Sequence, residues 1–468
     1  MFVGRKQELS LLRSYLIDRT KAQLIILYGR RRIGKSTLIA KAVKKETNVL
    51  FFEGIEGARK HIQIEQFLTD LAVQTGRVRL GARNWREVFQ GLGELIRQGR
   101  WVLVFDEFPW MGGGRSQIVS ELKLHWDRWS KNPNICLFLC GSVASFMTRH
   151  LVHSKALHNR KTLEMCLGPL TPKESGRFIA RRSIREKAQL YMSLGGVPKY
   201  LEQIDPNTSL EKNLNRLCFS AGGFFIEEYE TLFKEQFRSI RTYESIVKSL
   251  ADAPASLSDL ARRVSVSKGG GFRGQVDNLI LAQFVREYTP VMLEGKRRTR
   301  TRSFKLIDPF LIFYFRYVHP NRSIIVRNRR GENLLRAIAG PTLHQYYGFA
   351  FERLCEDSIE VIIDRLGLTL ADIVAMGPFF RQQRGQKRGL QIDWLIVRRD
   401  SVWTLIEIKY SATPVGKKVI HDVQRKIERL NVPADISIEP VLISARGASR
   451  TVIAEDYFSH ILTLDDLL

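Results

Sequence analysis

The chain has 468 residues, of which 44% are hydrophobic and 26% charged, an ordinary composition for a soluble globular protein. This length exceeds one ordinary domain, so two or three packed cores are expected, and no run of about 18 apolar residues occurs, which excludes a membrane-spanning helix. The 74 Lys and Arg residues against 48 Asp and Glu give a net charge of +26. This surplus favours a polyanionic partner, with nucleic acid as the first expectation and a solvated basic surface or an anionic membrane face as alternatives.

The five cysteines show no spacing typical of a zinc site, and most lie in apolar surroundings. They are therefore expected to be buried thiols in a reducing compartment. The first ten residues, MFVGRKQELS, contain no apolar signal core. These features together predict a cytoplasmic protein that does not bind membranes.

Residues 1–180 alternate short apolar runs with amphipathic helical patterns. The apolar runs are Leu24–Tyr28, Val49–Phe52, Trp101–Phe105 and Ile135–Cys140. Continuous runs of this length suit parallel strands that are covered on both faces, with helices as crossovers. The sequence therefore predicts an α/β domain built on a parallel sheet.

A glycine-rich loop, GRRRIGKS, follows the first predicted strand and leads into a helix that begins at Lys35. Its glycines permit backbone geometry that turns successive N–H groups towards an anion. Lys35 is expected to reach the β- and γ-phosphates of ATP, and the Ser36 hydroxyl to bind Mg²⁺. The predicted ATP-binding residues of this segment are Gly29, Arg30, Arg31, Arg32, Ile33, Gly34, Lys35, Ser36 and Thr37.

Polar side chains also end two later strands. Asp106 and Glu107 follow the run Trp101–Phe105, and adjacent carboxylates at the end of a buried strand are costly unless a cation or a reaction requires them. Asp106 is expected to hold Mg²⁺, and Glu107 to polarise the attacking water. Ser142, after the strand Ile135–Cys140, is expected to sense the γ-phosphate. The sequence therefore predicts an active ATPase.

The middle of the chain reads as mostly helical. A helix is predicted from Ser256, a second one over Phe272–Leu281, and then a hairpin of Phe284–Tyr288 with Ser303–Leu306 around the basic tip Gly295–Arg302. Helix, turn, helix and basic hairpin predict a winged-helix domain over residues 236–320. Contact with DNA phosphates and a role in protein interaction both remain open for it.

Residues 341–468, after a linker over 321–340, return to a mixed α/β pattern with strands Ile392–Val397 and Thr404–Lys409. Asp393 and Glu407 are expected to meet on adjacent strands and bind Mg²⁺. Lys409 would orient a water or stabilise negative charge beside the metal. Glu352, in a helix over Phe349–Ile359, is a further candidate ligand. The alternative is an ordinary surface Glu–Lys pair.

Several N-terminal motifs occur in an order that resembles archaeal-type P-loop ATPases of the AAA+/STAND lineage. The resemblance implies an ATPase core over 1–180, with its Gly-Arg segment near the adenine, and a helical lid over 181–235 that reports nucleotide state. Arg160 would be a phosphate-facing or neighbour-facing arginine, the latter in a homo-oligomer, with a solvated surface charge as the alternative. The motifs are Phe2-Val3-Gly4-Arg5, the phosphate loop, Asp106-Glu107, Gly141-Ser142 and Gly195-Gly196-Val197-Pro198.

The Asp393…Glu407-x-Lys409 arrangement resembles the PD-(D/E)xK nucleases and the C-terminal (DUF234-type) domain that accompanies these ATPases. This resemblance implies a nuclease-like α/β fold. The chain departs from the pattern at Gln391, where related proteins commonly carry an acidic residue. Loss of that charge would weaken the metal site or leave a domain that binds without cutting.

The whole chain is thus predicted to be an ATP- and Mg²⁺-dependent protein that binds DNA and cleaves phosphodiester bonds. The four expected parts are a P-loop parallel-sheet ATPase, a helical lid, a winged helix and an α/β nuclease-like domain. The rival hypothesis is a signalling ATPase switch whose C-terminal domain is a degenerate scaffold that does not cut. Gln391 favours the rival, and the intact Glu407-x-Lys409 pair favours cleavage.

Overall fold

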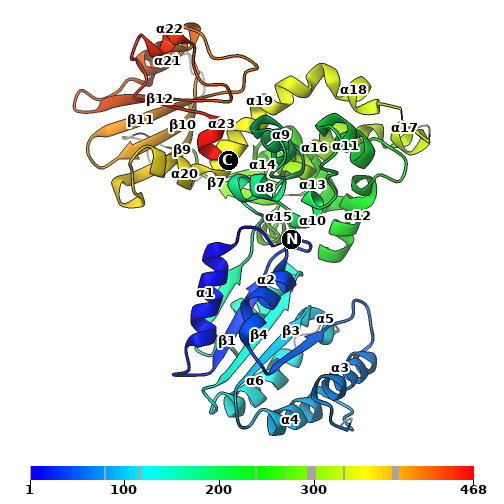
Figure 1. Cartoon of the computed structure of the whole chain (residues 1–468). Coiled ribbons are helices and arrows are strands. Elements are labelled where there is room, and N and C mark those ends of the chain that lie inside the picture. Colours follow the sequence, from blue (N-terminus) through cyan, green and yellow to red (C-terminus); the bar gives the residue numbers. More distant parts are fainter. Residues whose placement is uncertain are drawn as a thin grey trace. The chain divides into compact units, whose positions relative to one another are not determined.

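The computed structural model describes residues 2–78, 81–113, 117–237, 240–267, 269–291, 293, 302–329, 332–381 and 389–468 (Figure 1). They form two compact units, and each is described by itself. The first unit comprises Met1–Pro169, Glu230–Tyr243 and Arg273–Phe284, and the second comprises Leu170–Tyr229, Glu244–Phe272 and Val285–Leu468. The domain boundaries expected from the sequence stay predictions.

The described part of the first unit contains a five-stranded sheet in the order β2-β3-β4-β1-β5, and all its strand pairs are parallel. The four predicted apolar runs form strands whose ends differ from the prediction by at most one residue, which confirms the parallel α/β architecture. The strands are β1 (Gln23–Tyr28), β2 (Val49–Glu53), β3 (Trp101–Asp106), β4 (Ile135–Gly141) and β5 (Leu163–Cys166).

Helices cover both faces of this sheet, so alternate side chains of β1 enter different hydrophobic cores (Figure 1). Leu24 and Ile26 pack into the core with α3, α4 and α6, whereas Ile25 and Leu27 pack into the core with α1 and α2. This double burial explains why the strands read as continuous apolar runs. The helices are α1 (Lys6–Ile17), α2 (Lys35–Ala42), α3 (Lys60–Thr75), α4 (Trp85–Leu95) and α6 (Gln117–Trp129).

Two segments from later in the chain pack with this unit. They contain the end of α12 (Phe224–Gln236), the start of α13 (Ile240–Asp252) and most of α15 (Gly270–Leu281). Gln283 donates to Cys166 Sγ over 2.9 Å, and Arg149 donates to Asn278 Oδ1 over 2.8 Å, which ties the α15 segment to the part of this unit that contains the parallel sheet. The unit also contains η1 (Val43–Lys45), α5 (Phe108–Met111), α7 (Ala144–Phe146) and η2 (Met147–Val152).

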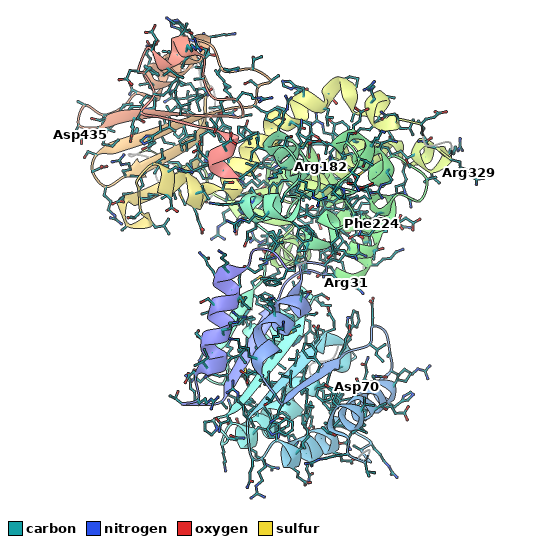
Figure 2. All side chains as sticks on the ribbon, viewed as in Figure 1. Arg31, Asp70, Arg182, Phe224, Arg329 and Asp435 are labelled. Atoms are coloured by element: carbon teal, nitrogen blue, oxygen red, sulfur yellow. The ribbon has the colours of Figure 1, made fainter. Side chains whose placement is uncertain are left out.

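The second unit begins with a helical region. Thr171 and Glu174 form a capping box at the start of α8. Arg182, labelled in Figure 2, lies in the turn before α9 and donates to the carbonyls of Asp205 and Thr208, which ties this turn to the loop over residues 205–208. The helices of this region are α8 (Pro172–Phe178), α9 (Ile184–Leu194), α10 (Pro198–Leu201), α11 (Leu210–Cys218), α14 (Leu257–Arg263), α16 (Pro309–Phe313), η3 (Tyr314–Val318), η4 (His319–Asn321), α17 (Arg322–Arg327), α18 (Leu334–Ile338), α19 (Gly340–Asp357) and α20 (Ile359–Arg365).

The strands of a small antiparallel sheet lie in sequence between the helices α13 and α16, on both sides of α14. Its described strands are β6 (Ala255–Ser256), β7 (Val285–Tyr288) and β8 (Ser303–Leu306), in the order β6-β8-β7. The hairpin expected for the wing is therefore present. Its basic tip, predicted over Gly295–Arg302, lies outside the described residues except for Arg302, which pairs with Glu287.

The C-terminal region is built on a mixed sheet whose described strands have the order β13-β12-β11-β10-β9. Helix α21 (Lys418–Leu430) packs Val419 and Val423 against one face, and Asp435, labelled in Figure 2, lies in the turn before β12. The other elements are β9 (Ile373–Arg381), β10 (Leu390–Arg398), β11 (Val402–Lys409), β12 (Ser437–Ser444), β13 (His460–Leu462), η5 (Leu370–Asp372), α22 (Arg450–Ile453) and α23 (Leu464–Leu467).

Candidate functional site

The phosphate loop connects the carboxyl end of β1 to α2, as the sequence predicted. Gly29, Arg32 and Gly34 have φ angles of 151°, 72° and 88°, so the loop uses left-handed backbone at three of its positions. A Cβ on Gly29 would lie 2.3 Å from the Leu167 carbonyl oxygen, so only glycine fits there. The loop is therefore built with the backbone turns that direct N–H groups to an anion.

The polar side chains of the loop already converge. The buried ammonium of Lys35 donates to the carbonyls of Gly29 and Arg30 over 3.1 and 3.2 Å, and the Ser36 hydroxyl donates to Asp106 Oδ2. Lys35 and Asp106 are each 5% exposed. Ser36 and Asp106 are 70 residues apart in sequence, and their side-chain oxygens thus meet as a pair of possible metal ligands.

Glu107 lies beside this pair with a strained backbone. Its φ is 45°, an unfavourable value for a residue with a side chain, and such strain often accompanies functional sites. Its Oε2 accepts two hydrogen bonds from Ser142, one from the backbone N–H over 3.0 Å and one from the hydroxyl over 2.8 Å. The structure therefore brings Glu107 and Ser142 together, and the Ser142 hydroxyl contacts the carboxylate.

One further residue at this edge was not among the predicted site residues. Glu53 ends β2 opposite Asp106, and burial together with Asp106 raises the pKa of its carboxyl. The signal was present in the sequence, because an acidic residue follows this apolar run as it follows Trp101–Phe105. Arg5, which the family resemblance placed near the adenine, donates to the Gly168 carbonyl over 2.5 Å and to Ile33 over 3.4 Å.

Arg160 lies at the opposite edge of the sheet. It directly precedes β5, which runs parallel to β1, whereas the phosphate loop follows β1. Its guanidinium binds both carboxylate oxygens of Asp127 on α6, over 2.6 and 3.1 Å. This position favours the alternative of a surface charge over a phosphate-facing arginine within the same chain, because the chain must return to the amino edge before a parallel strand begins. The neighbour-facing alternative stays a prediction.

The predicted carboxylates of the C-terminal region also meet, and an irregular strand brings them together. In β10, Ile392 and Leu395 both enter the core that packs on α21, although strict alternation would place them on opposite faces. The register with β9 shifts between these two residues, as in a β-bulge. Asp393 lies in this bulge, and its Oδ2 accepts the Ile408 backbone N–H over 2.9 Å.

Glu407 is the centre of this second cluster. It is 0% exposed, and its two oxygens accept from Lys409 and from Lys426 of α21, each over 2.6 Å. Lys426 also lies 3.9 Å from Asp393. Sequence reasoning missed Lys426, although it shares the helix face of the buried Val419, Val423 and Leu430 at helical spacing.

Glu352 of α19 completes the neighbourhood. Burial, and then the nearby negative charge of Asp393, raise the pKa of this carboxyl to about 7. Burial and Glu407 likewise raise the pKa of Asp393. Gln391, near the start of β10, is exposed. Within the described residues, no group of three or more His, Cys, Asp or Glu side chains has a metal-binding arrangement.

Comparison with known proteins identifies the N-terminal part. Residues 2–204 match a family described as an ATPase domain predominantly from Archaea. An uncharacterized ATP-binding protein of Methanocaldococcus jannaschii is 52% identical over 46 residues, which are 10% of this chain and 76% of that protein. The chain belongs to this ATPase family.

Two further proteins resemble this ATPase over most of its length. An uncharacterized protein of Methanocaldococcus jannaschii is 25% identical over 433 residues, which are 91% of this chain and 92% of that protein. The Walker-type ATPase of Pyrococcus abyssi shares the fold, with a TM-score of 0.50 and 20% identity over 67% of this chain and 96% of that chain. Residues 314–422 match a second family, described as Archaea bacterial proteins of unknown function.

The residues present in this ATPase fit the groups that its chemistry requires. In the phosphate loop, Lys35 presents an ammonium beside backbone turned for an anion, and Ser36 with Asp106 offers the oxygen ligands that Mg²⁺ prefers. In the C-terminal cluster, the Lys426 ammonium lies 3.9 Å from Asp393 and 2.6 Å from Glu407. None of the described helices is long and apolar enough to cross a membrane.

Replacing Arg160 tests whether this arginine contributes to ATP hydrolysis, in its own chain or in a neighbouring subunit. Arg160→Ala is expected to leave the ATP affinity and kcat of this ATPase within about twofold, because an exposed ion pair contributes little and this one lies away from the phosphate loop. The measurement is steady-state turnover over a range of protein concentrations, with Asp127→Ala as the matched control. A large loss of kcat in Arg160→Ala alone would instead indicate an arginine that acts on a neighbouring subunit.

Proposed function

We propose that this ATPase binds nucleic acid, with DNA as the first candidate, and cleaves phosphodiester bonds with Mg²⁺ in its C-terminal region. The observation that carries the proposal is the cluster of Asp393, Lys409 and Lys426 around the fully buried Glu407. Burying a carboxylate completely is costly, and a half-buried surface pair does not require it. The free-energy cost of burying Glu407 and the choice of carboxylates and lysines around it are those expected of a catalytic site.

Each side chain of the cluster has a proposed role. Asp393 and Glu407 would hold Mg²⁺ through their carboxylate oxygens, and Mg²⁺ bound there would neutralise charge on a phosphate. Lys409, whose side chain is 40% exposed, is the group that reaches substrate, and it would orient a water or stabilise the developing negative charge. Glu352 would be a further ligand in its ionised form, which requires a pH above its raised pKa.

The proposed ATPase chemistry uses the first site. Lys35 and the loop backbone bind the phosphates, Ser36 and Asp106 hold Mg²⁺, and Glu107 polarises the attacking water. Hydrolysis would then change the relation between the ATPase and the regions that follow it in the chain. The net charge of +26 supports a phosphate-rich partner for the whole protein.

Salt dependence tests the nucleic-acid half of the proposal. DNA affinity is expected to fall about 100-fold or more between about 50 and 200 mM salt, because each neutralised phosphate releases condensed counterions. The measurement is fluorescence anisotropy with labelled single- and double-stranded DNA at several salt concentrations. A labelled uncharged peptide-nucleic-acid strand of the same sequence is the control. An affinity that does not change with salt would contradict the proposal.

A second candidate function is a signalling switch in which the C-terminal region is a scaffold. Two features favour it: residue 391 is Gln where the nuclease resemblance implies an acidic residue, and Lys426 binds the Glu407 carboxylate that a metal would need. This candidate predicts ATP turnover that is indifferent to DNA, together with a change of oligomeric state between ATP and ADP. Turnover assays with and without DNA, beside light scattering in each nucleotide, separate the two functions.

A further inference from the structure

The end of α12 reaches the ATP site from a distant part of the sequence. Gln236, its last residue, is 8% exposed, and its Nε2 donates to the Ser142 carbonyl over 2.7 Å. The two residues are 94 positions apart in sequence. Strand β4 ends at Gly141, so the Ser142 carbonyl lies just beyond the sheet, where a side chain is free to serve as its donor.

This contact continues to the carboxylate that is proposed to polarise water. Ser142 gives both of its own donors, the N–H and the hydroxyl, to Glu107 Oε2. Because the carbonyl and the two donors belong to one residue, fixing the carbonyl restricts rotation of the backbone that carries the donors. A continuous chain of short contacts therefore runs from Gln236 through Ser142 to Glu107.

The end of α12 is itself firmly placed in the same unit. Phe237 stacks on Tyr243 with ring centroids 3.9 Å apart, and Phe233 stacks on Phe284 with centroids 5.5 Å apart. The guanidinium of Arg30, in the phosphate loop, lies 5.5 Å from the centre of the Phe284 ring. Phe284 thus connects the segment that presents Gln236 with the loop that is expected to bind phosphate, so both contacts would respond to a shift of this segment.

We infer that Gln236 is a positioning residue for Glu107, so that the end of α12 sets the rate of ATP hydrolysis. The inference rests on the proposed role of Glu107. Gln236 acts by fixing Ser142, whose N–H and hydroxyl donate to Glu107. A carboxylate that is displaced by about an ångström loses alignment with its water, which costs up to about 100-fold in rate without a change in substrate binding.

The test compares three variants of the full chain. Gln236→Ala removes the side chain, and Gln236→Glu keeps its shape but replaces the N–H donor by an acceptor. Lys234→Ala is the matched control, because this lysine lies two residues earlier on α12 with a side chain that is 65% exposed. Each variant is measured for kcat, KM and the dissociation constant of a fluorescent ATP analogue, and its folding is checked by circular dichroism.

Both Gln236 variants are expected to lower kcat about tenfold, with nucleotide affinity within about twofold, while Lys234→Ala behaves as the parent. The decisive measurement compares the Glu107→Gln variant with the double variant that carries both Glu107→Gln and Gln236→Ala. Since Gln236 acts through Glu107, the second change is expected to have no further effect on the residual rate.

Two results would overturn the inference. One is an unchanged kcat in Gln236→Glu, which is the variant that keeps the side-chain volume and so separates positioning from packing. The other is an equal loss of rate when Gln236→Ala is made in the Glu107→Gln background and in the parent. If Glu107→Gln itself hydrolyses ATP at the parent rate, the proposed role of Glu107 fails instead.

Discussion

Glu107→Gln is expected to lower ATP turnover by about 100-fold or more and to leave ATP binding intact. The amide keeps the size of the carboxylate and still accepts the Ser142 hydrogen bonds through its oxygen, so the local structure persists. It lacks the negative charge that polarises a water molecule. Loss of rate with retained binding is the signature of a group that acts mainly in the transition state.

The measurement is single-turnover hydrolysis together with equilibrium binding of a fluorescent nucleotide. Lys35→Ala is the companion variant, and it is expected to lose binding as well, because its ammonium lies within the phosphate loop. Glu53→Gln is the matched control, since Glu53 lies opposite Asp106 at the same sheet edge but has no proposed role in hydrolysis. If Glu53→Gln abolished turnover and Glu107→Gln did not, the assignment of the two carboxylates would be reversed.

Local patterns were sufficient to predict which side chains meet at the carboxyl edge of the parallel sheet. The apolar runs, the glycine-rich loop and the acidic strand ends lie within short windows, and the edge of a parallel sheet brings the carboxyl ends of its strands together. Ser36, Asp106, Glu107 and Ser142 therefore lie in contact as a consequence of strand order. The same reasoning applies to Arg160, because a residue just before a parallel strand must lie at the amino edge. For this residue the order of the motifs along the chain implied a phosphate-facing role, whereas strand direction favours the alternative of a surface charge.

Other parts of the sites depend on contacts that sequence windows do not contain. Gln236 meets Ser142 across 94 residues, and no pattern around either residue indicates the other. The bulge at Asp393 is also invisible in the sequence, because Gln391–Val397 reads equally well as a regular strand. Lys426 is an intermediate case. Its helix face was readable, but its approach to Glu407 depends on how α21 packs on the sheet.

Glu407→Ala is expected to abolish Mg²⁺-dependent cleavage of plasmid DNA and also to destabilise the C-terminal region. The change removes a proposed metal ligand and leaves the ammonium groups of Lys409 and Lys426 without their shared carboxylate. Removing one partner of a buried ion pair costs about 3–5 kcal/mol. Because the lysine side chains are 40% and 22% exposed, water offsets part of this cost, and about 1–3 kcal/mol is expected here.

Loss of stability and loss of chemistry must be separated. Glu439→Ala is the matched control, because Glu439 lies on the neighbouring strand β12 and pairs with Arg398 over 2.6 Å, outside the cluster. It is expected to lower the melting temperature without loss of cleavage.

Lys426→Met gives the opposite test: it frees the carboxylates, so Mg²⁺ is expected to stabilise this variant more than the parent in thermal unfolding. If the parent leaves plasmid DNA intact with ATP and Mg²⁺, and Mg²⁺ stabilises neither protein, the C-terminal region is a scaffold. The switch hypothesis then accounts for the chain, because a buried carboxylate held by two lysines is an internal ion pair with no access for a metal.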